Sequence, residues 1–305
     1  MNFGVILCFA FVACWSLMQS AHTEVLVQLS RTNGVLQLLL FLAVAVVPFL
    51  RTRRVSWVDI AWPFGVAVIG IVVFAIGDGY PLRRSMVAAA YLFIGLRMGI
   101  GAVAMARATG VIFRTEFPRY RYRRLMLEQS GSRHVDAHLL AEIMTQGFAN
   151  LSVLALPGFL MAIDPHEGLR AVELAGFAVC VFGYGFESVA DLQKLGFISR
   201  NRGAVCDVGL WRFTRHPNYF GEWLVWTGLV IAAIPSWMAL RAVEPLYIWI
   251  GLGIGTLAAS AMLYTTLVYL TGAKPAEYFS ERKREGYRAY QARTPIFFPR
   301  LPKAR

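Results

Sequence analysis

Eight apolar segments, separated by short polar connections, dominate the sequence and limit the folds open to it. Each comes close to the roughly 20 residues that an α-helix needs to cross a bilayer. Hydrophobic residues make up 57% of the 305-residue chain, and charged residues only 16%. The pattern predicts an all-α polytopic integral membrane bundle in one domain, 1–305. The apolar segments are 4–19, 35–50, 57–77, 85–106, 143–163, 171–190, 219–236 and 244–271.

The number of predicted membrane helices, seven or eight, depends on segment 4–19. This segment lacks the basic residues that precede the apolar part of a secretory signal peptide. We therefore expect a membrane helix there and not a cleaved leader.

Lysine and arginine are unevenly distributed between the connections. Four connections carry 24 of the 30 basic residues: 51–56, 107–142, 191–217 and 272–305. The three that alternate with them carry 4: 78–84, 164–170 and 237–243. By the positive-inside rule, the basic connections and the carboxyl terminus face the cytoplasm. We assign the net charge of +12 to contact with anionic membrane lipids and a phosphate-bearing cofactor, and predict no nucleic-acid partner.

A polar octapeptide, Arg-His-Pro-Asn-Tyr-Phe-Gly-Glu at 215–222, opens the seventh apolar segment. Proline is well tolerated at the first position of a helix, so we expect a membrane helix to begin at Pro217. Asn218 and Glu222 would then lie four residues apart on one face. The free backbone donors of the first turn, with Arg215 beside them, favour an anion site.

Five charged residues fall in or at the edge of apolar segments: Asp59, Arg97, Glu187, Asp191 and Glu222. Ionisable groups inside a membrane are functional candidates, because burying them is costly. The alternative for Asp59 or Glu187 is a structural ion pair with Arg97. Asp191 and Lys194 precede Arg200 and Arg202, which favours a pocket that binds phosphates.

We predict no metal site. His134, His138 and Glu142 have a spacing that could bind a metal from one helix face, but no further ligand is evident in a segment that reads as a loop. Glycines 99–101 and 251–255 lie inside apolar segments without a strand before them, so they favour helix packing over a dinucleotide loop.

The run Asp191-Leu-Gln-Lys194, followed by Gly209-Leu-Trp211, the octapeptide and Trp226, resembles the carboxyl-terminal region of the steroid 5-alpha-reductase family. It is most similar to the bacterial branch left as a domain of unknown function. The tail pattern Gly286-Tyr287-x-x-Tyr290-x-x-Arg293-x-Pro295 fits the same group. The likeness covers 187–298, which is expected to be a reductase-like cofactor-binding region. It implies an enzyme of the bacterial inner membrane.

The resemblance implies transfer of hydride from NADPH to an activated carbon–carbon double bond of a steroid-like or other lipid enone. Asn218 and Glu222 match family positions that contact the nicotinamide end of the cofactor. The cofactor site would face the cytoplasm. The other residues implied at this site are Asp191, Lys194, Arg200, Arg215, His216, Tyr219, Glu277, Tyr287 and Tyr290.

On the substrate side, the family uses a glutamate and a tyrosine near the carbonyl. Asp59 resembles the glutamate position although it is an aspartate, and Tyr91 is the candidate tyrosine. A protonated Asp59, alone or with Tyr91, would stabilise negative charge developing on the carbonyl oxygen. Trp62 and Arg97 are expected on the same side.

Two other function classes remain open from the sequence. The Arg-His-Pro-x-Tyr segment and the tail are also similar to the isoprenylcysteine carboxyl methyltransferase family, which binds S-adenosylmethionine. A non-enzymatic lipid binder or transporter is the second alternative, although no internal repeat of the kind common in transporters is visible. Comparing the affinities for NADPH and S-adenosylmethionine separates the two enzymes.

Overall fold

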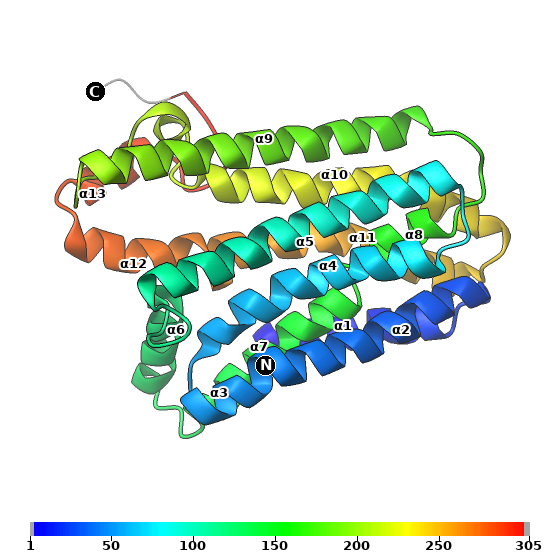
Figure 1. The fold of residues 1–305 in the computed structure, drawn as a ribbon, viewed down its shortest axis with the longest axis horizontal. Coiled ribbons are helices and arrows are strands. Elements are labelled where there is room, and N and C mark those ends of the chain that lie inside the picture. The colour runs from blue at the N-terminus through cyan, green and yellow to red at the C-terminus, as the bar shows by residue number, and fades with distance from the viewer. Residues whose placement is uncertain (1–2, 302–305) are drawn as a thin grey trace. The chain divides into compact units, whose positions relative to one another are not determined.

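A computed structural model describes residues 3–301, with side chains from residue 6, and contains α-helices but no strands in that range (Figure 1). Two π-helical turns, Leu42–Val46 and Thr266–Leu270, continue α2 and α11. The α-helices are α1 (Phe3–Gln19), α2 (Glu24–Phe41), α3 (Val47–Thr52), α4 (Val58–Ile76), α5 (Pro81–Thr109), α6 (Pro118–Gln129), α7 (Val135–Leu151), α8 (Leu156–Ala162), α9 (Ala171–Arg200), α10 (Pro217–Ala239), α11 (Leu246–Thr265), α12 (Ala273–Lys283) and α13 (Tyr287–Arg293).

Seven helical stretches of the described chain are long and apolar enough to cross a membrane, which confirms the predicted polytopic bundle. The first apolar segment forms a shorter helix, Ile6–Gln19. The crossing stretches are Glu24–Thr52, Val55–Ile76, Pro81–Thr109, Val135–Ala162, Ala171–Arg200, Pro217–Ala242 and Leu246–Lys283.

Two connections contain more helix than the sequence indicated. The basic segment 107–142, expected to be largely loop, contains α6 and the start of α7. Pro118 takes the first helical position of α6, where its missing N–H costs nothing. Helix α9 continues to Arg200, so the connection before α10 is shorter than predicted. The prediction that a helix begins at Pro217 is confirmed.

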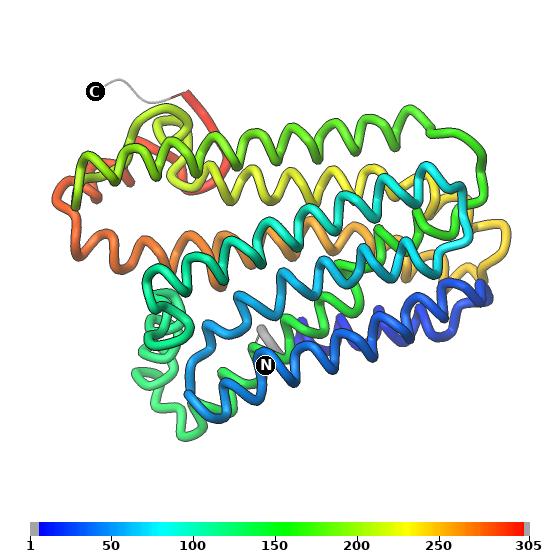
Figure 2. The backbone as a smooth tube through the Cα atoms, viewed as in Figure 1, coloured from blue at the N-terminus to red at the C-terminus, as the bar shows by residue number. Residues whose placement is uncertain are grey.

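The chain divides into two compact units. Unit 1 comprises 1–174 and 229–259, and unit 2 comprises 175–228 and 260–305. In unit 1, α4 and α5 run antiparallel and pack closely along their length (Figure 2). A Cβ on Gly95 would lie 2.5 Å from the Pro63 carbonyl oxygen and 2.3 Å from the Ala67 nitrogen. This position therefore accepts only glycine at the observed helix separation.

In unit 2, glycines allow α9 and the first half of α10 to approach closely. A Cβ on Gly221 would lie 2.6 Å from the Glu187 nitrogen, and one on Gly228 would lie 2.5 Å from the Cys180 nitrogen. Small residues at such contacts let the two helix backbones pack together in a membrane. This packing fixes the helix that carries Asn218 and Glu222.

The close contact at Gly221 can be tested by adding a methyl group. Gly221→Ala should destabilise the protein by about 1–3 kcal/mol, because the added methyl group overpacks a backbone contact. Gly185→Ala on α9 is the matched control, since a Cβ at that position would have no heavy atom within 4 Å. It should be neutral, or gain up to about 1 kcal/mol from helix propensity. Thermal unfolding in detergent measures both. Equal loss in both variants would contradict the packing argument.

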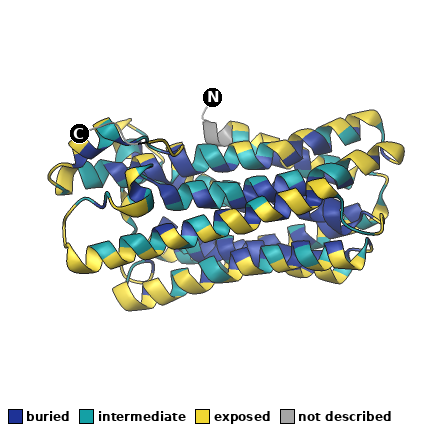
Figure 3. Ribbon diagram, turned by 90° about the horizontal axis from the view of Figure 1, so that it is seen from above, coloured by how far each residue is buried: buried dark blue, intermediate teal, exposed yellow. Residues whose placement is uncertain are grey.

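Exposed residues occur along many of the helices (Figure 3), and large apolar side chains are among them. On α9, Val181 is 71% exposed, Leu192 69% and Phe182 63%. Contiguous exposed apolar surface of this kind marks a membrane or partner interface. A lipid environment for these helices follows from their length and composition.

Candidate functional site

A buried ion-pair cluster connects the start of α10 to α12 in unit 2. Arg215 Nε lies 2.6 Å from Glu277 Oε1, and Arg215 Nη2 lies 3.1 Å from Glu277 Oε2. His216 Nε2 lies 2.9 Å from Glu277 Oε1, and Gln291 also donates to this carboxylate. The exposed fraction of Glu277 is 6% and that of His216 is 5%. The Glu277 carboxylate therefore accepts four hydrogen bonds while almost fully shielded from solvent.

Arg215 also binds the carboxyl-terminal tail. Its Nη1 donates to the carbonyl oxygens of Gln291 and Thr294, at 3.0 and 2.6 Å. These carbonyls end α13, where a cation complements the helix dipole. Four of the five guanidinium N–H groups are therefore used inside the protein. Arg215, implied by the resemblance at the phosphates, holds the tail against the loop before α10.

His216 is buried, and burial lowers the pKa of its imidazole below the usual value despite the neighbouring Glu277 carboxylate. A neutral imidazole carries one N–H, so Nε2 is the nitrogen that donates to Glu277. The ring stacks on Tyr219, with centroids 5.2 Å apart and planes 4° apart. The two stacked rings lie at the start of α10.

Two tail tyrosines complete this arrangement. Tyr290 donates a hydrogen bond of 2.6 Å to the Trp211 carbonyl oxygen, and its ring packs edge-on against Tyr287. Burial raises the pKa of both hydroxyl groups well above the usual range, so both stay protonated at neutral pH. Thr214 and Arg300 add further bonds between the loop and the tail. Tyr290, Thr214 and Arg300 therefore join the loop before α10 to the tail.

Asn218 differs from its neighbours because its polar group is not satisfied by the protein. Among the described residues, its Oδ1 atom is buried without a hydrogen-bond partner. Such an acceptor costs about 1–3 kcal/mol unless something donates to it. Helix α10 is continuous from Asn218 to Glu222, so the two side chains share a face as predicted. Asn218 Oδ1 is therefore an acceptor whose hydrogen-bonding capacity the described residues leave unused.

Basic residues gather at the end of α9 in the same unit. Lys194 Nζ lies 4.2 Å from the centroid of the Trp211 ring, which attracts the cation. Arg200 is exposed at the end of α9, and Arg202 is exposed in the turn after it. Asp191 is half-buried one turn before Lys194. The phosphate pocket that the sequence predicts for this segment stays a prediction.

The candidate acid in unit 1 has partners that the sequence did not indicate. Asp59 Oδ1 lies 2.7 Å from Arg119 Nη2 and accepts a hydrogen bond of 2.9 Å from the Tyr120 hydroxyl. Its other oxygen, Oδ2, is buried without a hydrogen-bond partner among the described residues. Burial, reinforced by the Asp59 charge, raises the pKa of Tyr120 well above the usual range. Arg119 and Tyr120 begin a run of arginines and tyrosines at 119–124, a composition that suits a membrane interface.

Tyr91 lies elsewhere in unit 1. Its ring is fully buried, and its hydroxyl donates 2.6 Å to the Leu154 carbonyl and accepts from the Gly158 nitrogen. Gly95 packs beside residues 63–67 of antiparallel α4, so Tyr91, one turn earlier on α5, lies level with about residue 69. Asp59 is therefore about ten residues, or roughly 15 Å, away along the helix axes. The structure does not bring this predicted catalytic pair together.

Trp62 and Arg97, predicted on the substrate side, occupy α4 and α5. The Trp62 carbonyl accepts a hydrogen bond of 2.9 Å from Asn150, within a buried amide cluster that includes Gln37. Arg97 is half-buried, near the middle of α5. The Asp59 carboxylate forms its ion pair with Arg119 of α6.

The described residues contain no group of three or more His, Cys, Asp or Glu side chains that could hold a metal. Glu142 of the weak sequence pattern pairs instead with Arg123, with Nε 2.7 Å from its carboxylate oxygen. His138 contacts Ser132 at 3.0 Å.

Comparison with known proteins adds one finding. A family described as "Protein of unknown function (DUF1295)" matches residues 46–294. The matched range includes Asp59, the α9–α10 glycine contact and the Arg215–Glu277 cluster. No curated protein and no solved structure matches the chain.

Proposed function

The chain belongs to the DUF1295 family, and we propose that it is a membrane-embedded, NADPH-dependent reductase. Its substrate would be a steroid-like or other lipid enone, reduced at the activated carbon–carbon double bond. The observation that carries this proposal is the buried, unpartnered Oδ1 of Asn218 within a motif similar to that of the steroid 5-alpha-reductase family. A buried acceptor in need of a donor fits the carboxamide of nicotinamide.

Some residues of unit 2 would contact the cofactor directly, and others would hold those residues in place. Asn218 would accept from the carboxamide, and Glu222, one turn later, would orient the same end. Lys194 and Arg200 would attract the phosphates. Arg215, His216 and Glu277 would act indirectly, by holding the tail and the first turn of α10 in place. Bound NADPH would supply the hydride.

The residues of unit 1 would supply the proton. Tyr120 donates a hydrogen bond to Asp59 Oδ1, so the proton of this pair is held at the phenol oxygen. Arg119 fixes Oδ1, which leaves Oδ2 to face a polar atom of the substrate. A donor placed at a carbonyl oxygen stabilises the negative charge that develops there during reduction. Tyr120 thus replaces Tyr91 as the tyrosine of this pair.

The proposal is tested by NADPH oxidation in the presence of a panel of lipid enones, using purified full-length protein. Tyr120→Phe should lower kcat about 100-fold while NADPH affinity is unchanged, because general acid groups contribute about 10²–10⁴-fold. Tyr91→Phe is the control, and should reduce thermal stability more than kcat because its hydroxyl bonds to the backbone of Leu154 and Gly158 in its own unit.

Absence of both NADPH binding and NADPH oxidation in folded protein would overturn the reductase proposal. Tight binding of S-adenosylmethionine in the same protein would instead indicate a methyltransferase. A normal kcat in Tyr120→Phe would remove the tyrosine from the proton path and leave Asp59 as the donor.

A further inference from the structure

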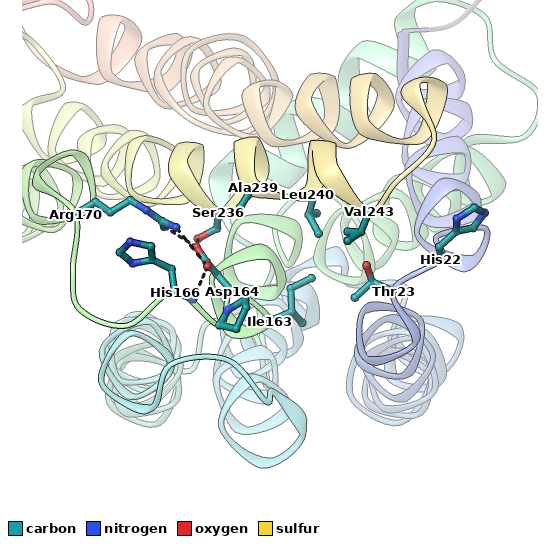
Figure 4. Close-up of a pocket in the computed structure, with 11 residues that line it drawn as sticks. His22, Thr23, Ile163, Asp164, His166, Arg170, Ser236, Ala239, Leu240 and Val243 are labelled. Carbon is teal, nitrogen blue, oxygen red and sulfur yellow. Dashed lines mark hydrogen bonds and ion pairs between the residues drawn. The ribbon is translucent and has the colours of Figure 1, made fainter.

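Unit 1 contains a cavity of about 690 Å³ that the proposed reaction does not use (Figure 4). It lies where α8 ends, where α10 ends and where α2 begins. Its volume is in the range of pockets that bind small ligands. The charge rule places the connections around it on the side opposite the cytoplasm. The lining residues are His22, Thr23, Ile163, Asp164, Pro165, His166, Arg170, Ser236, Ala239, Leu240 and Val243.

The carboxylate at the cavity is fully occupied by donors of the protein itself. Asp164 is 3% exposed and accepts from Arg170 at 2.6 Å, from Ser236 at 2.8 Å and from the His166 backbone nitrogen at 3.0 Å. Burial opposes its ionisation, but these donors outweigh burial and lower the pKa of the carboxyl group. Asp164 therefore positions Arg170 and has little capacity left for a ligand.

A second acid near the cavity is occupied in the same way. Glu244 is 3% exposed and caps the start of α2, accepting from the backbone nitrogens of His22 and Thr23 at 2.9 and 2.8 Å. The Thr23 hydroxyl donates to the same carboxylate. The oxygens of both buried acids are thereby occupied by donors of the protein.

The polar groups that remain at the cavity are mostly hydrogen-bond donors, or imidazoles that can either donate or accept. Figure 4 shows Arg170 and His166 at one end and His22 at the other, with Leu240 and Val243 between them. Arg170 uses Nη1 and Nη2 for Asp164 and Glu173, and none of the bonds that the described residues make involves its Nε. Both imidazoles are exposed. This arrangement favours a ligand group rich in acceptors, such as a phosphate.

The remaining wall is apolar, formed by Ile163, Pro165, Ala239, Leu240 and Val243. Free phosphate would gain nothing from this wall, and a plain hydrocarbon would leave the donors unused. We propose that the cavity binds an anionic membrane phospholipid, with its phosphate at the His166–Arg170 end and one acyl chain along the apolar wall. The cavity lies at the ends of helices long enough to cross a membrane, where lipid headgroups are expected.

The first test compares two tryptophan variants whose original side chains are equally exposed. Val243 lines the cavity and is 58% exposed, whereas Met238 is 59% exposed and does not line it. Native mass spectrometry of delipidated full-length protein would follow binding of phosphatidylglycerol, phosphatidylcholine and inorganic phosphate. Val243→Trp should weaken phosphatidylglycerol binding about tenfold by filling the cavity. Met238→Trp should leave that binding unchanged.

The second test removes the two exposed imidazoles. His22→Ala with His166→Ala should reduce the preference for phosphatidylglycerol over phosphatidylcholine and leave the melting temperature unchanged. Equal binding of both lipids by the wild type, or normal binding by Val243→Trp, would overturn the proposal. Binding of inorganic phosphate alone as tightly as phosphatidylglycerol would also overturn it, because the acyl chain would then contribute nothing. NADPH binding in unit 2 is measured separately and does not bear on these outcomes.

Discussion

Replacing Glu277 with alanine should destabilise the protein by about 3–5 kcal/mol, the usual cost of removing one partner from a buried ion pair. Arg215 would retain its charge with two tail carbonyls as its remaining partners. His216, already neutral because burial lowers its pKa, would lose the acceptor for its Nε2 hydrogen. Thermal unfolding in detergent measures the loss, and NADPH binding should fall with it as the tail detaches.

Helix α12 supplies a matched control for this experiment. Glu281 pairs with Arg288 at 2.7 Å, nearly the same distance as the Glu277–Arg215 pair, but the Arg288 side chain is 84% exposed. Glu281→Ala should change the free energy of unfolding by less than about 1 kcal/mol, because water replaces an exposed partner. Similar losses in the two variants would show that burial does not decide the strength of the cluster.

Asn218→Ala should weaken NADPH binding at least tenfold, which corresponds to about 1.4 kcal/mol. The same substitution should leave thermal stability unchanged or raise it. Asn218 Oδ1 is buried without a partner in the described protein, so its removal relieves a desolvation cost of about 1–3 kcal/mol. These two effects together are expected of a residue that binds a ligand but lowers the stability of the ligand-free protein.

NADPH fluorescence titration and thermal unfolding of the same samples measure both properties. Asn201→Ala is the control, because Asn201 is exposed and its side-chain amide donates only to the Phe197 carbonyl one turn earlier. It should leave NADPH affinity unchanged. Loss of stability in Asn218→Ala without loss of affinity would show that its carbonyl oxygen serves the fold.

The cofactor region illustrates how far sequence patterns reach. Pro217 marked the start of α10, and the spacing of Asn218 and Glu222 placed them on one face. The resemblance placed Arg215 and Glu277 in the same region, but it assigned both to the cofactor. Their contact joins residues 62 positions apart, and no local pattern contains that information. The structure shows that Arg215 uses two N–H groups for Glu277 and two for tail carbonyls.

The acid in unit 1 depends even more on contacts that are distant in the chain. Asp59 was identified because a charge inside an apolar segment is costly. Its partner was sought in another apolar segment, at Tyr91 or Arg97, whereas the structure places Arg119 and Tyr120 of α6 beside it. The basic and aromatic residues of α6 suit a membrane interface as well as contact with a nucleotide, and the sequence did not connect them with Asp59.

Local sequence was sufficient to establish the membrane bundle, the positions of its crossing helices and the start of α10. Hydropathy, helix-start residues and the limits on burying charge act over one helix or less, so they can be read from neighbouring residues. Which charges pair, which glycines face a neighbouring backbone and where the cavity beside Arg170 forms became visible only in the folded chain. These features depend on contacts between segments far apart in the chain, whose register is set by the packing of whole helices.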